Sequence, residues 1–278
     1  MDLNGVEALE RPRGEAAAAA RAGRLAAGEA WLAGGTWLFS EPQPGLRRLV
    51  DLEAAGWTPL TIDADGLEIA ATCTIAELDA LETPADWAAA PLIGRCCRAF
   101  LASFKIWNVA TVGGNLCLAL PAGPMISLTA ALDGTCRILG RDGATREVAA
   151  LDFVRDAGVN ALAPGELLRA IRIPADRLRR RTAFRRISLS PMGRTGALAI
   201  GTLTPGGGLD LTVSGGVRRP VRIAFPTLPT PQEAAQAVDA AIPAETWFDD
   251  LHGAPAWRRA VTLDFAAEIA AELGEPAE

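Results

Sequence analysis

The stretch Asn108-Val-Ala-Thr-Val-Gly-Gly-Asn-Leu-Cys-Leu-Ala-Leu-Pro121 decides the fold of this chain. It lies within a longer run, residues 106–132, that holds no charged residue. That run is long enough to cross a bilayer, but its interior holds glycines and prolines that would leave backbone groups unpaired in lipid. We therefore predict no membrane span, and instead a buried strand, a glycine turn at residues 113–114 and a buried helix.

A second glycine pair occurs in Ala33-Gly34-Gly35-Thr36-Trp37-Leu38, directly after a short apolar run. Glycine pairs let the backbone approach a ligand closely and adopt positive φ, and consecutive N–H groups in such turns bind anionic oxygens. Two loops of this kind could hold one pyrophosphate between them. The alternative is that each is a tight turn packed on the core. Neither loop matches the Rossmann or P-loop pattern.

The composition excludes several classes of protein. The chain has 278 residues, which is one large or two average domains, and a net charge of −6 that argues against a nucleic-acid partner. Five cysteines without a CxxC pattern indicate buried, reduced thiols. With one histidine and no tyrosine, we predict no metal site and no catalytic side chain. The N-terminus lacks a signal-peptide pattern, so we expect a cytoplasmic protein.

Short strands and helices alternate along the first two thirds of the chain, which favours an α+β fold. Thr74 and Glu77 have the spacing of a capping box at the start of one helix. We predict helices at 14–28 (closed by Gly28), 74–81, 88–104 and 127–132, and strands at 30–33, 49–52, 58–62, 67–71, 109–112 and 136–139.

The last third begins after a strand that ends at Pro174. Six arginines follow between residues 177 and 186; a solvated face is the ordinary interpretation, and a docking edge or phosphate contact is the alternative. Beyond them the pattern predicts a small sheet covered by helices. We place strands at 197–204, 209–214 and 221–224, and helices at 231–241 and 258–273.

Four segments together carry a family resemblance. The two glycine loops, LAPGELLRAIRIP (162–174) and TAFRRISLSPMGRTGALAI (182–200) resemble, in order and spacing, the FAD-binding medium subunit of molybdenum-containing hydroxylases, the xanthine dehydrogenase and carbon monoxide dehydrogenase family. The resemblance implies a two-subdomain FAD-binding α+β fold of the PCMH (vanillyl-alcohol-oxidase-like) type. A small C-terminal α+β domain with a three- to four-stranded antiparallel sheet would follow. The expected units are residues 1–57, 58–176 and 177–278.

The resemblance also implies which residues hold the FAD. The first loop would wrap the diphosphate and the second would hold it from the other side, while Leu168 would lie against the flavin and Arg186 where relatives often have a lysine. The implied cofactor-binding residues are Ala33, Gly34, Gly35, Thr36, Trp37, Leu38, Thr111, Gly113, Gly114, Asn115, Leu168 and Arg186.

Two departures from the family pattern affect these positions. Trp37 replaces a polar residue, and it either stacks on a flat ring or packs into the core. After the second glycine pair, the run Leu120-Pro-Ala-Gly-Pro124 lacks the serine and aspartate that relatives tend to have.

By the same resemblance the chain is an electron-transfer flavoprotein subunit. Its partners would be a molybdopterin-binding large subunit and a 2Fe-2S small subunit, and its acceptor NAD, a quinone or oxygen. One alternative is a non-catalytic assembly scaffold that has lost FAD. A second is a stand-alone flavin reductase.

Overall fold

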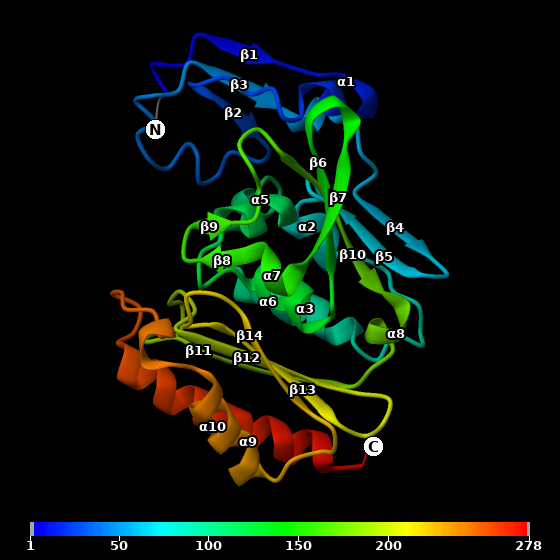
Figure 1. Cartoon of the computed structure of the whole chain (residues 1–278), viewed down its shortest axis with the longest axis vertical. Coiled ribbons are helices and arrows are strands. Elements are labelled where there is room, and N and C mark those ends of the chain that lie inside the picture. The colour runs from blue at the N-terminus through cyan, green and yellow to red at the C-terminus, as the bar shows by residue number, and fades with distance from the viewer. Residues whose placement is uncertain (1–2, 277–278) are drawn as a thin grey trace.

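The computed structural model describes residues 3–276 and contains three separate larger sheets. They follow one another in chain order from the top to the bottom of Figure 1. The sheets fall within the three units expected from the sequence, whose boundaries stay a prediction.

The first sheet is parallel, and its strand order is β1-β3-β2. Helix α1 is shorter than the predicted 14–28, because the chain turns away at Gly23, whose φ is 69° and whose missing side chain admits Arg141. Gly28 therefore does not close a helix; it lies in the turn before β2 at φ 82°. The elements are β1 (Ala8–Glu10), α1 (Glu15–Arg21), β2 (Glu29–Leu32), β3 (Arg48–Asp51) and the 3-10 helix η1 (Leu52–Ala55).

The second sheet is antiparallel, with strand order β4-β5-β10-β6-β7. Its strands are β4 (Leu60–Asp63), β5 (Gly66–Ala70), β6 (Thr135–Leu139), β7 (Thr145–Ala149) and β10 (Leu167–Pro174). The accompanying helices are α2 (Ile75–Asp79), α3 (Ala90–Ala99), α4 (Phe104–Trp107), α5 (Val112–Leu118), α6 (Pro124–Ala131), α7 (Ala150–Phe153) and η2 (Arg141–Gly143). A two-stranded ribbon, β8 (Val154–Asp156) and β9 (Val159–Asn160), completes this unit.

Thr74 caps α2 as predicted: its side-chain oxygen accepts a hydrogen bond from Glu77 N, and the Glu77 carboxylate accepts one from Thr74 N. The predicted helix 88–104 is too long at its C-terminal end. It ends at Ala99, and the carbonyl of Phe100 accepts a hydrogen bond from the indole of Trp107 at 2.9 Å.

The predicted strand at 109–112 and the glycine turn after it are also wrong. Thr111 is the N-cap of α5, so Gly113 and Gly114 lie in the first turn of a helix and neither has positive φ. The reason is packing: a Cβ on Gly113 would come within 2.5 Å of the Ala71 side chain. Gly113 therefore allows α5 to lie directly against the end of β5.

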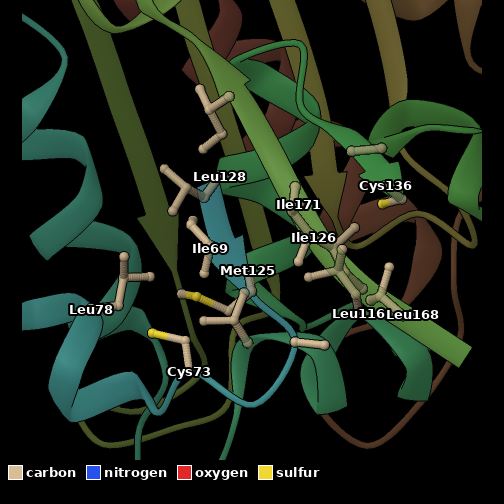
Figure 2. Packing of buried hydrophobic residues seen from close by; sticks show 14 of the residues in the cluster. Ile69, Cys73, Leu78, Leu116, Met125, Ile126, Leu128, Cys136, Leu168 and Ile171 are labelled. Carbon is tan, nitrogen blue, oxygen red and sulfur yellow. The ribbon is translucent and has the colours of Figure 1, made fainter. Parts of the chain in front are cut away.

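Helix α6 lies at the centre of the molecule, and all of its residues are buried. Figure 2 shows its side chains Met125, Ile126 and Leu128 among residues of the central sheet, α2 and α5. Leu168 of β10 belongs to the same cluster. Leu168 thus belongs both to the hydrophobic core and to the lining of the cavity described below.

The third sheet is antiparallel with strand order β11-β12-β13-β14. Helices α9 and α10 cover one face, and α6 lies on the other (Figure 1). The elements are α8 (Ala175–Leu178), β11 (Thr182–Ile187), β12 (Ala197–Leu203), β13 (Leu209–Gly215), β14 (Val221–Phe225), α9 (Pro231–Ala241), η3 (Ala244–Thr246) and α10 (Pro255–Gly274). The α+β fold class and the four-stranded C-terminal sheet are confirmed.

Polar contacts join the C-terminal sheet to the end of α6. The carboxylate of Asp133 pairs with both Arg177 and Arg222, and we call this group the Asp133 clamp. Nearby, the Ser214 hydroxyl donates to Ser127 Oγ at 2.7 Å in a fully buried bond. The two units are therefore held together by charge pairs as well as by apolar packing.

The arginine-rich segment is largely ion-paired. Arg179 bonds Asp86, Arg180 bonds Asp176, and Arg185 bonds Glu268 and Glu272. These pairs join the segment to neighbouring elements of the same chain.

Candidate functional site

A cavity of about 670 Å³ lies where the three units meet. This volume is typical of sites for small molecules and cofactors. Its lining includes the first glycine loop, the start of α5, the first two residues of β10 and the loop that joins β11 to β12. Eleven of the twelve residues predicted to bind cofactor line it; only Arg186 does not.

The first glycine loop, residues 33–38, presents unused backbone donors. Within the described residues, none of the N–H groups of residues 34–38 donates a hydrogen bond to a protein acceptor. Two backbone hydrogen bonds fix the conformation of the loop: Phe39 N donates to Gly35 O at 2.8 Å, and Ser40 N donates to Trp37 O at 2.9 Å. Gly35 has a φ of 68°, a conformation that favours glycine. A run of free N–H groups on a fixed loop is suited to anionic oxygens.

The second glycine pair is built differently. The N–H groups of Val112, Gly113 and Gly114 donate to Cys73 O, Ala71 O and Thr111 Oγ1. Its polar contribution to the cavity therefore comes from side chains. The Asn115 Oδ1 atom accepts a bond from Met125 N at 3.1 Å, which leaves the amide NH₂ as the donor.

Aromatic and aliphatic side chains form the walls. Trp37 is 39% exposed and lines the cavity, so the prediction that it packs into the core is wrong. Trp31 also lines the cavity and donates from its indole N–H to Glu166 O at 3.1 Å. Leu168 is 2% exposed and lies in the lining, and its contact with the flavin stays a prediction.

Several lining residues were not predicted. Leu101, Leu118, Leu120 and Met192 have no distinguishing residue type; the last three lie inside segments that carry the family resemblance, and that position is the signal that could have indicated them. Leu120, Ala122, Gly123 and Pro124, from the run that lacks the expected serine and aspartate, form part of the wall.

Among the residues that the structure describes, two charged ones line the cavity, Glu166 and Arg194. Glu166 is paired with Arg146, whose hydrogen bonds hold the pKa of this carboxyl below its ordinary value. Arg194 makes no ion pair or hydrogen bond with any described residue. The cavity therefore has one cation that the protein leaves unneutralised.

The five cysteines are free, as predicted. Cys117 lines the cavity, and burial raises the pKa of its thiol to about 12. Among residues 3–276 no cluster of acidic, cysteine or histidine side chains is arranged to hold a metal ion. None of the helices in the same range combines the length and apolar character needed to span a bilayer.

The fold is that of an α+β protein, and its cavity combines free backbone donors suited to anionic oxygens with apolar walls. A sequence model of the family described as "FAD binding domain in molybdopterin dehydrogenase" matches residues 13–176, more than half of the chain. The chain belongs to this family, and its cofactor is FAD.

Known relatives agree with this assignment. Over 117 residues the chain is 34% identical to the carbon monoxide dehydrogenase medium chain of Afipia carboxidovorans. That match spans 42% of this chain and 40% of the length of the relative.

Solved structures extend the likeness to nearly the whole chain. Reconstituted CO dehydrogenase from Oligotropha carboxidovorans matches with a TM-score of 0.78 and 25% identity, covering 99% of this chain and 100% of that one. Quinoline 2-oxidoreductase from Pseudomonas putida 86 has a TM-score of 0.76 at 20% identity, with coverage of 99% and 100%, and shares the fold.

The residues present fit FAD. The free N–H groups of residues 34–38 suit its pyrophosphate, and Gly34 keeps that loop in close contact with the segment before α5. The apolar walls and Trp37 suit flat aromatic rings. The cavity volume is sufficient for a cofactor-sized ligand.

Proposed function

We propose that this chain is the FAD-binding electron-transfer subunit of a molybdenum hydroxylase complex. It would receive electrons from a 2Fe-2S small subunit, which in turn receives them from a molybdopterin-binding large subunit. The acceptor would be NAD, a quinone or oxygen. Family membership and the likeness to CO dehydrogenase support the proposal.

The single observation that carries it is the cavity itself. Eleven of the residues predicted to bind the cofactor line this one space, which supports the proposal. When bound, FAD supplies both one-electron and two-electron redox chemistry, which suits a link between one-electron clusters and a two-electron acceptor.

The chain's own residues do the binding and the shielding. The N–H groups of residues 34–38 and the amide of Asn115 would donate to polar oxygens of the cofactor. Buried Leu168 and its neighbours would exclude water from one side of the site. No side chain is assigned as acid or base, because Glu166 is held by Arg146 and the Cys117 thiol stays protonated.

Electron transfer from a partner tests the proposal. The chain would be co-expressed with a molybdopterin-binding large subunit and a 2Fe-2S small subunit, and the purified complex would be reduced anaerobically with its substrate. We expect the visible band of the flavin to bleach at the turnover rate of the complex. A complex in which the clusters are reduced while the flavin band persists would contradict the proposed role. The matched control omits the small subunit, and there the flavin is expected to stay oxidised.

A further inference from the structure

The loop between β11 and β12, residues 188–196, brings the unpaired Arg194 into the cavity lining. The loop is ordered by its own bonds: Gly196 N donates to Ile187 O at 2.9 Å and Gly193 N donates to Ser190 O at 2.9 Å. At its tip Met192 is 81% exposed and also lines the cavity. A loop closed in this way offers its side chains to a ligand from a fixed position.

The half-buried guanidinium of Arg186 donates two hydrogen bonds to the loop. Its Nε donates to Thr195 Oγ1 at 2.7 Å, and a terminal nitrogen donates to Gly193 O at 2.6 Å. These two acceptors lie on either side of Arg194 in the sequence. Arg186 therefore fixes the residues that flank the free cation, while it is absent from the cavity lining itself.

Burial of the Arg186 guanidinium costs the folded protein desolvation free energy. Arg186 has no carboxylate partner among the described residues, and burial lowers its pKa. A desolvated guanidinium bound only to neutral oxygens forgoes the charge pairing that usually accompanies such burial. Elsewhere in the same segment, Arg177, Arg179, Arg180 and Arg185 all pair with carboxylates.

We propose that Arg194 neutralises negative charge on the bound FAD, and that Arg186 is a positioning residue that acts through the 188–196 loop. FAD offers two sources of that charge. One is the pyrophosphate, which is charged in every redox state; the other is the flavin ring, which gains charge on reduction. The inference deepens the proposed function, since it concerns the same site.

Two measurements on apo-protein reloaded with FAD distinguish whether Arg194 neutralises the pyrophosphate or the reduced flavin ring. The first is the Kd for oxidised FAD, from quenching of flavin fluorescence; the second is the midpoint potential of the bound flavin. If Arg194 contacts the pyrophosphate, Arg194→Met raises the Kd by roughly tenfold or more, as expected for loss of a charge-assisted hydrogen bond. If it contacts the flavin, the Kd is kept and the midpoint potential falls.

Arg219→Met is the matched control, because Arg219 is an exposed arginine of the same domain, unpaired among the described residues and outside the cavity lining. We expect it to leave both readouts unchanged. An Arg194→Met variant that matches this control in both readouts would overturn the inference.

A double-mutant cycle tests the positioning role. Arg186→Met should reproduce part or all of the Arg194→Met effect, and combining the two should add little. Full additivity would show that Arg186 acts independently of Arg194. If Arg186→Met does not fold, Thr195→Val takes its place in the double-mutant cycle with Arg194→Met. This variant removes one acceptor of Arg186 without changing the charge.

These outcomes are distinct from failure of the proposed function. A wild-type chain that binds no FAD would contradict the cofactor assignment. A wild-type chain that binds FAD and passes electrons, beside an Arg194→Met variant equal to Arg219→Met, would contradict this inference alone.

Discussion

Gly34 lies directly against Val109: a Cβ built on Gly34 would come within 1.7 Å of the Val109 carbonyl oxygen. These residues belong to the two segments that contribute the glycine pairs of the site, and they come from different units, Gly34 from the first and Val109 from the second. The contact is between backbones, so no side-chain rearrangement can relieve it. The absence of a side chain at Gly34 thus sets how closely the first glycine loop approaches the segment that leads into α5.

Gly34→Ala is expected to push this loop off the second segment. Overpacking of this kind costs about 1–3 kcal/mol, and the displaced N–H groups should weaken FAD binding by roughly tenfold or more. The measurement is the Kd for FAD together with Tm. Gly45→Ala is the control, because a Cβ at Gly45 meets nothing within 4 Å. Equal FAD affinity in the two variants would show that the contact does not shape the site.

Trp37 is expected to contribute aromatic contact to the cofactor. Trp37→Ala should raise the Kd for FAD by about twofold to tenfold, the equivalent of about 0.5–1.5 kcal/mol of stacking, and Trp37→Phe should recover part of the loss. Phe104→Ala is the control, since Phe104 is 73% exposed and lies outside the lining. An affinity unchanged in Trp37→Ala would rule out stacking.

The Asp133 clamp is expected to stabilise the junction with the C-terminal sheet. Asp133→Asn keeps the side-chain size and tolerates the φ of 52° at this position, but it removes the charge that Arg177 and Arg222 share. The expected loss is about 1.5–3 kcal/mol of unfolding free energy.

Thermal unfolding measures the effect of that substitution. Asp239→Asn, which breaks an exposed pair with Arg259, is the control and should cost about 0–1 kcal/mol. If the two variants have the same Tm, the clamp is not a structural contact of consequence.

The pairing of Glu166 with Arg146 should make stability depend on pH. The pKa of this carboxyl is lower in the folded chain than its ordinary value, so the carboxylate stabilises the fold above that ordinary value and loses its contribution as pH falls through the folded pKa. The Tm difference between wild type and Glu166→Gln should therefore be full at neutral pH and shrink in acid. Glu7→Gln, at a site 80% exposed, should show little difference at any pH. A Glu166→Gln difference that grows as pH falls would reverse the assigned sign.

Local signals in the sequence predicted much of this molecule. The capping box at Thr74 and the helix at 231–241 depend on neighbouring residues, and both are present. The errors occur where tertiary packing overrides propensity. Two adjacent glycines are poor helix formers, yet α5 contains Gly113 and Gly114 because only glycine permits its contact with Ala71.

The sequence predicts those parts of the candidate site that lie in recognisable motifs. The glycine loops and Leu168 lie in segments with a recognisable pattern, and the structure brings them to one cavity. Arg194 carries no pattern of its own, and its place depends on a loop fixed by Arg186 through bonds that sequence spacing does not reveal.

We infer that this chain binds FAD in the cavity between its two glycine segments. The most direct test is the visible absorption spectrum of the purified chain, with the released cofactor identified and quantified after denaturation. We predict a flavin band and close to one FAD per chain. A folded, colourless chain that takes up no FAD on incubation would contradict the claim.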